Sequence, residues 1–489
     1  MFKPELGEAK KYLKEYTVIP VYKEIFADIK TSVEILKGFM KENKQCFLLE
    51  SVENGESWGR YSFLGCDPKL TVSCNDGKVV IDDGKITEIQ TDEPVKILRE
   101  ILAKYKSPKL ESLPPFTGGF VGCFSYDYIK YVEKSLKLEN RNVEKFDDFS
   151  LMLFDKIIAV DHFKQKIFII ANAASDNFEK SYEKAKKDIN ELEAVIKSPS
   201  SEIKFKSELK SDLRLLHNEE EFSAMISKIK KHIYEGDIFQ AVISNGIEAD
   251  FEGSLLETYR VLRTLNPSPY MVYLNFKNSE IAAASPETLV SLQNGELTNY
   301  ALAGTVRRGK NDQEDKELIA DLLKDEKELS EHNMLVDLGR NDLGKISEFG
   351  SVKVSEYLKI LKFSHVSHIA SVIKGKIMPK YDQFDAIAAV IPAGTLSGAP
   401  KIRACEIINS LEKHKRGSYG GAIGYIDFTG NMDTCIAIRM AKRQNAKVYI
   451  QAGAGIVADS NPKKEFQECL NKAQAIVEAV KTASTKNDK

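Results

Sequence analysis

A glycine- and proline-rich stretch at residues 391–401 constrains the fold more than any other part of the chain. It reads IPAGTLSGAPK and lies between two apolar runs, 386–391 and 402–408. Its glycines permit backbone conformations that other residues avoid, and its prolines stiffen the path and remove hydrogen-bond donors. The stretch therefore predicts a tight loop between two ordered elements, with the hydroxyls of Thr395 and Ser397 at its tip. Taken alone, it is typical of an ordinary strand-to-helix connection.

The chain is long enough for two large regions. It has 489 residues, more than one compact core usually holds. A polar tract that begins SPSSE at residue 198 follows a highly charged segment with helical spacing, 176–197. Such a tract is typical of a linker. We therefore predict a boundary near 205–212, with an N-terminal region at 1–205 and a C-terminal region at 212–485.

Charge and cysteine usage exclude several classes of protein. The 70 Lys and Arg residues balance 72 Asp and Glu residues, and a net charge of -2 is no footprint of binding to nucleic acid or to an anionic membrane. No apolar run approaches the roughly 20 residues of a membrane span, and the first residues lack the apolar segment of a signal peptide. The seven cysteines form no CxxC pair, which predicts reduced thiols and a cytoplasmic location.

The spacing of apolar residues predicts a mixture of strands and helices. Residues 70–82 read as a hairpin around the turn Asn75-Asp76-Gly77, and a helix is predicted after Asn218, where Glu221 completes a capping box. Further helices are predicted at 312–338 and 462–480, and further strands at 151–160, 166–171, 238–244, 271–276 and 280–287. The mixture predicts an α/β or α+β sandwich. No GxGxxG follows a strand and no GxxxxGK[ST] occurs, so nucleotide-binding folds are disfavoured.

Two Glu-x-x-Glu pairs are candidate ligands for a cation. Glu328 and Glu331 lie three residues apart in a predicted helix, and Glu465 and Glu468 repeat the spacing near the start of the last helix. Each pair taken alone is most often a solvated helix face. If the two pairs meet, four carboxylates need a cation to stay ionised together, and oxygen ligands suit Mg²⁺.

Arg439 and two glycines are candidates for binding an anion. Arg439 is predicted in a strand whose neighbours on the same face are small and apolar, so its guanidinium needs an anionic partner. That partner is either a structural carboxylate or the carboxylate of a substrate, and both alternatives stay open on spacing alone. Gly453 and Gly455 follow one strand later, where backbone N–H groups suit an anion. Together the three residues suggest a ligand with two carboxylates or with a carboxylate and an ether.

Glu287 and two histidines are candidates for acid–base chemistry. Glu287 ends an apolar strand, where burial would raise its pKa enough for general acid catalysis, and the alternative is an edge carboxylate. His365 and His368 lie three residues apart. Without a Cys or a carboxylate at ligand positions, this spacing argues against zinc. A packed histidine with satisfied hydrogen bonds is the alternative at both positions.

Many motifs in one order resemble those of chorismate-utilising enzymes. They include LLES at 48–51, GGFVGCFSYD at 118–127, GDIFQAVIS at 236–244, NPSPYM at 266–271, SPE at 285–287, LAGTVRRG at 302–309, DEKELSEHNMLVDLGRNDLG at 325–344, PAGTLSGAPK at 392–401 and QAGAGIVADS at 451–460. The set covers most of the chain and is most similar to component I of anthranilate synthase. The resemblance implies the chorismate-binding-enzyme fold, in which layered, antiparallel-rich sheets carry helices on the outside. It also implies an N-terminal region interwoven with a C-terminal chorismate-binding catalytic domain.

The resemblance implies a reaction and roles for its residues. Chorismate and ammonia would yield anthranilate and pyruvate, the first step from chorismate to tryptophan. Glu287 would protonate the departing 4-hydroxyl while ammonia attacks C2, and His368 with Thr395 would assist the loss of pyruvate. Gln240 matches the ammonia-using members, because isochorismate and salicylate synthases have a lysine there to activate water. Ala303 also matches anthranilate synthase, because many aminodeoxychorismate synthases have a lysine there that forms a covalent adduct.

The resemblance also assigns residues to ligands. Mg²⁺ would be held by Glu331 and Glu468, with Glu328 and Glu465 close by, and would bridge to the ring carboxylate. Chorismate would bind Gly304, Thr305, Tyr419, Arg439, Gly453, Ala454 and Gly455. L-Tryptophan, as a feedback inhibitor, would bind Glu50, Ser51, Asn266, Pro269, Tyr270 and Met271. Two alternatives stay open for this inhibitor site: a simple proline-rich turn, or a tryptophan pocket without a control role.

The source of ammonia points to a partner. No GxCxG nucleophile elbow surrounds any cysteine, so no glutaminase motif is present. Ammonia would therefore come from glutamine through a separate amidotransferase subunit, or be taken up free. Two other functions stay open. They are component I of aminodeoxychorismate synthase, in the folate branch, and a non-catalytic tryptophan-sensing subunit.

Overall fold

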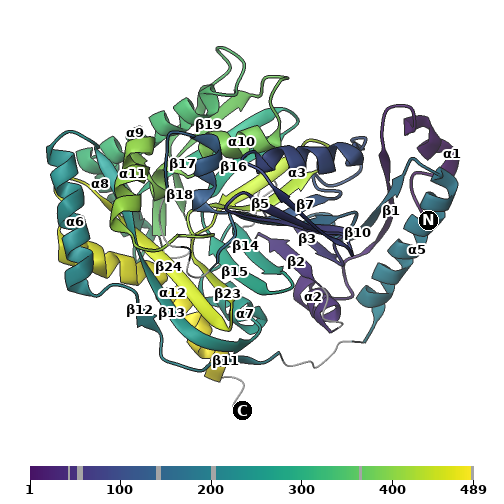
Figure 1. Cartoon of the computed structure of the whole chain (residues 1–489), viewed down its shortest axis with the longest axis horizontal. Helices are drawn as coiled ribbons and strands as arrows, with labels where there is room; N and C mark the ends of the chain where they lie inside the picture. The colour runs from purple at the N-terminus through teal and green to yellow at the C-terminus, as the bar shows by residue number, and fades with distance from the viewer. Residues whose placement is uncertain are drawn as a thin grey trace.

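Two large antiparallel sheets with helices on their outer faces form the computed structural model (Figure 1). The structure describes residues 1–41, 45–51, 59–138, 142, 145–199, 205–362 and 366–485. The arrangement confirms the predicted α+β class with layered, antiparallel sheets.

The first sheet has 13 strands among the described residues. Eleven of them follow one another in the order β1 (Val18–Phe26), β10 (Lys166–Ala174), β9 (Lys156–Asp161), β3 (Tyr61–Cys66), β2 (Cys46–Glu50), β14 (Tyr270–Asn275), β15 (Ser279–Ser285), β23 (Met440–Gln444), β24 (Lys447–Ile456), β13 (Gln240–Gly253) and β11 (Ser207–Leu209). The short strands β12 (Arg214–Leu215) and β20 (Gly398–Ala399) also pair with β13. β13 is therefore the strand on which this end of the sheet is built.

The second sheet has 11 strands within the described ranges. Their order is β18 (Lys353–Lys362), β19 (Val366–Lys376), β17 (Glu296–Arg307), β16 (Thr288–Gln293), β22 (Met432–Ile436), β21 (Ala422–Asp427), β7 (Gly119–Phe124), β8 (Phe149–Phe154), β4 (Leu70–Asn75), β5 (Lys78–Asp82) and β6 (Ile86–Gln90). β17 and β19 are the long central pair, and they form a ladder from Glu296 to Arg307.

Both sheets take strands from each side of the predicted boundary. In the first sheet β2 pairs with β14, which places Glu50 opposite Met271. In the second sheet β7 pairs with β21, which places Gly122 opposite Gly424. A side chain at Gly122 is excluded, because a Cβ there would lie 2.1 Å from a backbone oxygen of β8. The predicted division at 205–212 stays a prediction, but the two regions share both sheets.

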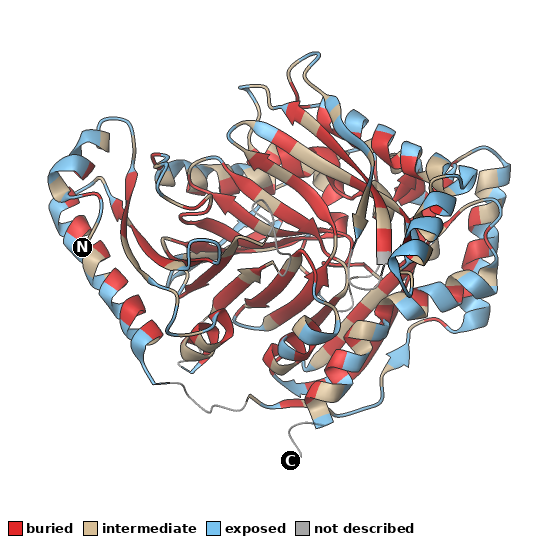
Figure 2. Ribbon diagram, turned by 180° about the vertical axis from the view of Figure 1, so that it is seen from behind, coloured by how far each residue is buried: buried red, intermediate tan, exposed pale blue. Residues whose placement is uncertain are grey.

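Helices cover the outer face of each sheet. The first sheet is covered by α2 (Ser32–Met40), α5 (Phe178–Lys197), α6 (Glu219–Tyr234), α7 (Leu256–Leu265), α11 (Lys401–Leu411) and α12 (Pro462–Thr485). The second is covered by α3 (Pro94–Leu102), α9 (Glu326–Gly344) and α10 (Gln383–Val390), with α8 (Asp312–Leu322) beside β17. The short helices α1 (Leu6–Ala9) and α4 (Ile129–Val132) lie in connections. Figure 2 shows buried residues along the sheets and exposed ones on the outer sides of the helices.

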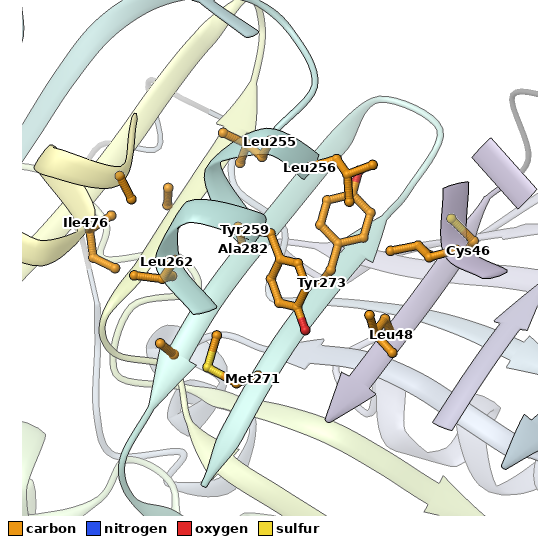
Figure 3. Close-up of a cluster of buried hydrophobic side chains, with 14 of the residues drawn as sticks. Cys46, Leu48, Leu255, Leu256, Tyr259, Leu262, Met271, Tyr273, Ala282 and Ile476 are labelled. Atoms are coloured by element: carbon orange, nitrogen blue, oxygen red, sulfur yellow. The ribbon is translucent and has the colours of Figure 1, made fainter. Parts of the chain in front are cut away.

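The faces of β14 show how strand alternation divides the core. In Figure 3, Tyr259 and Leu262 of α7 lie over Met271 and Tyr273 of β14, and all four side chains are fully buried. Because successive side chains of a strand point to opposite faces, Tyr270 points the other way, towards the second sheet. β14 therefore contributes side chains both to the core under α7 and to the space between the two sheets.

Local sequence signals for turns and helix starts are confirmed. β4 and β5 form the predicted hairpin, and Asp76 and Gly77 occupy its turn with positive φ. The capping box of Asn218 and Glu221 begins α6. In each case a short-range hydrogen-bond pattern fixes the element, so no long-range contact is needed to predict it.

Several predicted elements differ from the structure in extent. The predicted strand 238–244 is the longer strand β13, Gln240–Gly253. The predicted helix 312–338 is two helices, because the Asp325 side chain accepts hydrogen bonds from the first turn of α9 and starts a new helix there. The predicted strand 151–160 belongs to two strands, β8 and β9. The apolar run 386–391 lies largely in helix α10, capped by Asp382, so the glycine-rich loop joins two helices.

The cysteines lie in the interior. All seven belong to the described chain, are buried and form no disulfide. Burial raises the pKa of the Cys74 and Cys469 thiols to about 11, so both stay protonated at neutral pH. Among the described helices, none is long and apolar enough to cross a membrane.

Candidate active site

One cavity of about 540 Å³ collects most of the predicted site residues. It is bordered by β13 and β24 of the first sheet, β17 and β19 of the second, and helices α9 and α12. The predicted residues that line it are Gln240, Glu287, Gly304, Thr305, Glu328, Glu331, His368, Thr395, Tyr419, Arg439, Gly453, Gly455, Glu465 and Glu468. Residues far apart in sequence thus line one cavity.

The floor of the cavity is the end of β24. β23 pairs with β24 only over residues 447–450, so among the described strands the backbone from Gln451 to Ile456 has no partner on that side. Glycines keep this edge accessible: a Cβ on Gly453 would lie 3.0 Å from the Tyr419 hydroxyl. Ala454, between the two glycines, buries its methyl group in the core on the other face and does not line the cavity.

Gln240 lies at the start of β13, and its side chain is only 3% exposed. Its Nε2 atom lies so near β24 that a Cβ on Gly455 would be 2.9 Å away. Its carbonyl oxygen, Oε1, has no hydrogen-bond partner in the described structure. Because an unpaired buried acceptor is unfavourable, this oxygen marks a place where an N–H donor can bind.

Glu287 and Thr395 meet at another wall of the cavity. The Thr395 hydroxyl donates a hydrogen bond of 3.2 Å to Oε1 of Glu287. Burial raises the pKa of Glu287 to about 8, although Thr395 and the nearby Lys472 amine oppose this effect. The carboxyl is therefore protonated at neutral pH, which is the state a general acid requires.

A buried ion pair holds the glycine-rich loop in place. Arg416 is 3% exposed and pairs with Glu412 at 2.7 Å. Its guanidinium also donates to the backbone oxygens of Leu396 in the loop and Val242 in β13, each at 2.6 Å. The loop approaches β13 so closely that a Cβ on Gly398 would lie 2.1 Å from a backbone oxygen. Arg416 thus fixes the loop that carries Thr395.

Arg439 lies in the connection between β22 and β23 rather than in a strand, which corrects the predicted position. Its φ of 52° is unfavourable for a residue with a side chain, and such strain is typical of functional sites. The guanidinium donates to the Lys472 carbonyl oxygen. No carboxylate in the described ranges lies within ion-pair distance of it, and burial lowers its pKa. The alternative of a structural ion pair is therefore disfavoured, and a ligand carboxylate suits the site.

His368 on β19 lies opposite Thr305 on β17, and the Thr305 hydroxyl is 2.8 Å from His368 Nδ1. Burial lowers the pKa of His368, so the ring is neutral at pH 7 and can accept a proton. β17 shifts register at Gly304, whose φ of 78° suits a glycine. His365 lies outside the described residues.

The four predicted metal glutamates lie along one side of the cavity, two on α9 and two on α12. Burial raises the pKa of Glu328, Glu331 and Glu465, and repulsion from neighbouring carboxylates adds to it. Carboxylates that raise one another's pKa favour a bound cation, and a set of oxygen donors suits Mg²⁺.

The glutamates do not form a compact three-ligand group. Within the described chain, the one such group has ligand atoms from His232, Glu235 and Asp237 within 4.8 Å of one another. Asp237 in this group also pairs with Arg403 at 3.0 Å. One or two carboxylates suffice for Mg²⁺ when water and substrate complete its shell, so the glutamate set still fits that ion.

A second cavity, of about 430 Å³, lies between the two sheets. Five of the predicted inhibitor residues line it, namely Glu50, Ser51, Pro269, Tyr270 and Met271. Asn266 does not, because it ends α7 outside the cavity. The remaining walls include the aromatic rings of Tyr61, Phe63, Tyr300 and Tyr425 and the polar side chains of Arg60, Gln293 and Asp433.

Two of these predicted residues, Glu50 and Met271, direct their side chains towards helix α7. The Glu50 carboxylate accepts a hydrogen bond of 2.7 Å from Tyr259 and pairs with Arg263 at 3.0 Å. Met271 packs its side chain under α7 (Figure 3). Ser51 differs, because its buried hydroxyl has no hydrogen-bond partner in the described structure.

Comparison with known proteins places the chain in a family. A model of the chorismate binding enzyme family matches residues 44–478. Anthranilate synthase component 1 of Acetivibrio thermocellus is 43% identical over 493 residues and 99% of each chain, and that of Aquifex aeolicus is 40% identical over 98% of each. The crystal structure of anthranilate synthase component I from Streptococcus pneumoniae matches with a TM-score of 0.77 and 36% identity, over 93% of this chain and 99% of that one. The chain belongs to the anthranilate synthase component I family.

Lys472 and Gln451 are among the residues that line the first cavity but were not predicted from the sequence. The Lys472 amine lies 2.7 Å from Glu468 and 3.2 Å from the carbonyl oxygen of Gly453. Its spacing of four residues from Glu468 places both on one face of α12, a signal that the sequence contains. Gln451 precedes Gly453 by two residues, so strand alternation places both on the same face.

Proposed function

We propose that this chain is the large subunit of an anthranilate synthase, which converts chorismate and ammonia to anthranilate and pyruvate. One observation carries the proposal. A single cavity contains a protonated acid, Glu287, a neutral base, His368, and an unpaired acceptor, the carbonyl oxygen of Gln240. These are the three groups that an amination followed by an elimination requires. The names of the similar proteins support the same activity, the first step from chorismate to tryptophan.

The two carboxylates of chorismate fit two places in the cavity, one beside Arg439 and one beside Lys472 and the proposed Mg²⁺ ligands. Arg439, which has no carboxylate partner in the described chain, lies with Tyr419 and the open edge at Gly453 and Gly455, and suits the enolpyruvyl carboxylate. The ring carboxylate is then directed towards Lys472 and the four glutamates. Gly304 and Thr305 border the substrate from β17.

Mg²⁺ suits the four-glutamate side of the cavity. Glu331 and Glu468 would hold it, with Glu328 and Glu465 beside them. The ion supplies positive charge that offsets repulsion among these carboxylates and attracts the ring carboxylate of the substrate. The burial of Glu331 supports this assignment, because an ionised carboxylate in such surroundings needs a nearby cation.

The proton transfers are divided between two residues. A hydroxyl is a poor leaving group, so Glu287 gives its proton to the 4-hydroxyl of chorismate as ammonia attacks C2. Thr395 then donates to the carboxylate that remains. His368, held by Thr305, accepts the ring proton that is lost when pyruvate leaves and the ring becomes aromatic.

Gln240 orients the nucleophile. Its unpaired carbonyl oxygen accepts an N–H of ammonia, and its Nε2 atom rests against Gly455. Ammonia comes from glutamine through a separate amidotransferase subunit, because no cysteine of this chain lies in a nucleophile elbow. The word component in the names of the similar proteins supports such a partner.

L-Tryptophan, as a feedback inhibitor, suits the second cavity. The rings of Tyr61, Phe63 and Tyr425 provide walls for an indole. The unpaired Ser51 hydroxyl and the Asp433 carboxyl provide acceptors for its ammonium group. The size of about 430 Å³ is in the range of small-molecule sites.

Ala303 disfavours the main alternative, aminodeoxychorismate synthase component I. It lines the first cavity with a methyl group and offers no amine for a covalent adduct. A non-catalytic tryptophan-sensing subunit is disfavoured because Arg439, His368 and the glutamates all line the cavity.

One assay tests the proposal. The purified chain is mixed with chorismate, Mg²⁺ and an ammonium salt at mildly alkaline pH, and anthranilate fluorescence and pyruvate are followed with and without L-tryptophan. Anthranilate and pyruvate in equal amounts support the proposal, and suppression by L-tryptophan supports the inhibitor site. A product that keeps its enolpyruvyl group would identify the chain as aminodeoxychorismate synthase component I. The absence of any turnover would favour the non-catalytic tryptophan-sensing subunit.

A further inference from the structure

The two cavities are bridged by three neighbouring strands of the second sheet. β17 lines the second cavity with Tyr300 and the first with Gly304. β22 lines the second cavity with Asp433, and Arg439, three residues after its end, lines the first. β16 lines the second cavity with Ser291 and is preceded directly by Glu287 in the first. Both cavities therefore rest on the same strands.

A series of hydrogen-bonded side chains lies where these strands pass from one cavity to the other. Tyr270 lines the second cavity, and its hydroxyl is 2.8 Å from the Thr288 hydroxyl and donates to Asp433 at 3.0 Å. Tyr270 has one hydroxyl proton, and Asp433 accepts it when ionised. The Thr288 hydroxyl therefore donates to the oxygen of Tyr270. Thr288 is 1% exposed and lines neither of the two large cavities.

Thr288 is bonded directly to Glu287 along the chain, so movement of one residue reaches the other through a single peptide unit. The backbone oxygen of Glu287 accepts a hydrogen bond of 2.9 Å from Ile436 N–H, and the Ile436 oxygen accepts one of 2.7 Å from Ser285. Ser285 in turn lies opposite Tyr270 in the β14–β15 ladder. Tyr270 thus contacts the chain on both sides of Glu287.

The space beside this contact permits a small movement. A third cavity of about 30 Å³ is lined by Thr288 and shares Glu287 and Thr395 with the first cavity. It also shares Tyr300 with the second cavity. Glu287 therefore has room to shift when the second cavity changes shape, and a general acid acts only within hydrogen-bond reach of its target.

We infer that the Tyr270–Thr288 hydrogen bond couples occupancy of the second cavity to the position of Glu287, which makes Thr288 a positioning residue for the acid. The inference rests on the proposed function, because it takes L-tryptophan as the ligand of the second cavity. A ligand that displaces the Tyr270 ring moves Thr288 and, through the backbone, the Glu287 carboxyl. A displacement of about 1 Å from productive geometry is enough to cost about 10²-fold in rate.

The test uses Thr288→Val, which removes the hydroxyl but keeps the shape, and Thr288→Ser, which keeps the hydroxyl. Thr434→Val is the matched control, because Thr434 is also buried, lies on neighbouring β22 and donates to a backbone oxygen. For each variant, L-tryptophan binding is measured by calorimetry and inhibition by the rate of ammonia-dependent anthranilate formation. Tyr270→Phe removes the other hydroxyl of the same hydrogen bond. It is used in place of Thr288→Val if that variant does not fold.

The expected result separates binding from inhibition. Thr288→Val keeps the L-tryptophan Kd within about twofold of the unaltered chain. The rate of anthranilate formation that remains at saturating L-tryptophan rises by about tenfold or more, because the occupied protein stays active. Thr288→Ser restores inhibition, and Thr434→Val behaves as the unaltered chain does. In Thr288→Val without tryptophan, kcat falls while the KM for chorismate changes little, because only the acid is mispositioned.

Three outcomes overturn the inference. Thr288→Val with unchanged binding and unchanged inhibition shows that the hydrogen bond carries no coupling. Equal loss of inhibition in Thr434→Val shows a general effect of altering the sheet. If the unaltered chain forms anthranilate but binds no L-tryptophan, the inhibitor site and this inference fail together while the catalytic proposal stands.

Discussion

Thr395 donates a hydrogen bond of 3.2 Å to Glu287, although 108 residues separate them in the chain. The contact joins the glycine-rich loop to the turn between β15 and β16. The hydrogen bond favours the carboxylate, whereas burial favours the neutral acid, and burial prevails. Thr395 is therefore well placed to hold Glu287 after it has given up its proton.

Turnover should fall as the pH rises through about 8, because Glu287 then loses the proton that it donates. Below that pH the raised pKa keeps the acid form in place. Glu287→Gln should lower kcat by about 10²–10⁴-fold. Thr395→Val removes a bond that favours the carboxylate, so it should move the falling limb to higher pH. The pH profile of kcat measures both effects, and a flat profile well above pH 8 would contradict the acid role.

Glu468→Gln should weaken Mg²⁺ binding, because the proposed site would lose one of its carboxylate ligands. We expect the Mg²⁺ concentration for half-maximal activity to rise by about tenfold or more. The increase in Tm that Mg²⁺ produces should shrink in parallel, which gives a readout apart from activity. Glu478→Gln is the matched control, because Glu478 is exposed on the same helix away from the cavity. Equal Mg²⁺ dependence in both variants would remove Glu468 from the metal site.

Gly455→Ala should impair the use of ammonia. The new Cβ would lie 2.9 Å from Nε2 of Gln240 and force that side chain to move. We expect a loss of up to about 10²-fold in kcat/KM for ammonia. Gly344→Ala, at the end of α9, is the control, because a Cβ there meets nothing within 4 Å. An unchanged KM for ammonia would argue against Gln240 as the group that orients it.

Local signals in the sequence were enough to predict many elements and most site residues. The hairpin at Asp76 and Gly77 and the capping box at Asn218 depend on neighbours in sequence, so they could be read directly. The break before α9 was missed, because Asp325 competes with a helical pattern that continues on both sides. The positive φ of Arg439 could not be predicted, because tertiary contacts impose it.

Ser291→Phe should block the second cavity. Ser291 lies opposite Asp433 on the cavity wall, and a ring at that position would fill space that the indole needs. L-Tryptophan should then fail to bind by calorimetry, while anthranilate formation persists and becomes insensitive to it. Ser223→Phe, on α6 away from both cavities, controls for the added ring. Binding retained in Ser291→Phe would place the inhibitor elsewhere.

Arg416→Ala should destabilise the protein strongly. It would leave Glu412 as a buried carboxylate without its partner and remove the bonds to the loop. Breaking such a pair typically costs about 3–5 kcal/mol. Arg403→Ala removes two exposed ion pairs, with Asp237 and Glu406, and should cost much less. Urea unfolding compares the two, and equal midpoints would show that the buried pair contributes little.

The joining of distant segments could not be predicted from sequence spacing. The resemblance to known enzymes named the residues of the first cavity, but only the structure shows that Gln240 has an unpaired oxygen there. It also shows that Glu50 is already paired with Tyr259 and Arg263, so the second cavity is built differently from the expected list. Both findings depend on strand order across the sheets, which local patterns do not encode.

The sharing of both sheets by the two halves of the chain has a consequence during synthesis. β2 and β7 emerge from the ribosome long before their neighbours β14 and β21. Until then they present unpaired backbone edges, which favour association with other chains. An isolated fragment of residues 1–205 should therefore stay unfolded or aggregate. Folding of this enzyme must wait until nearly the whole chain has been made, so its yield in a cell should depend on chaperones that shield those edges.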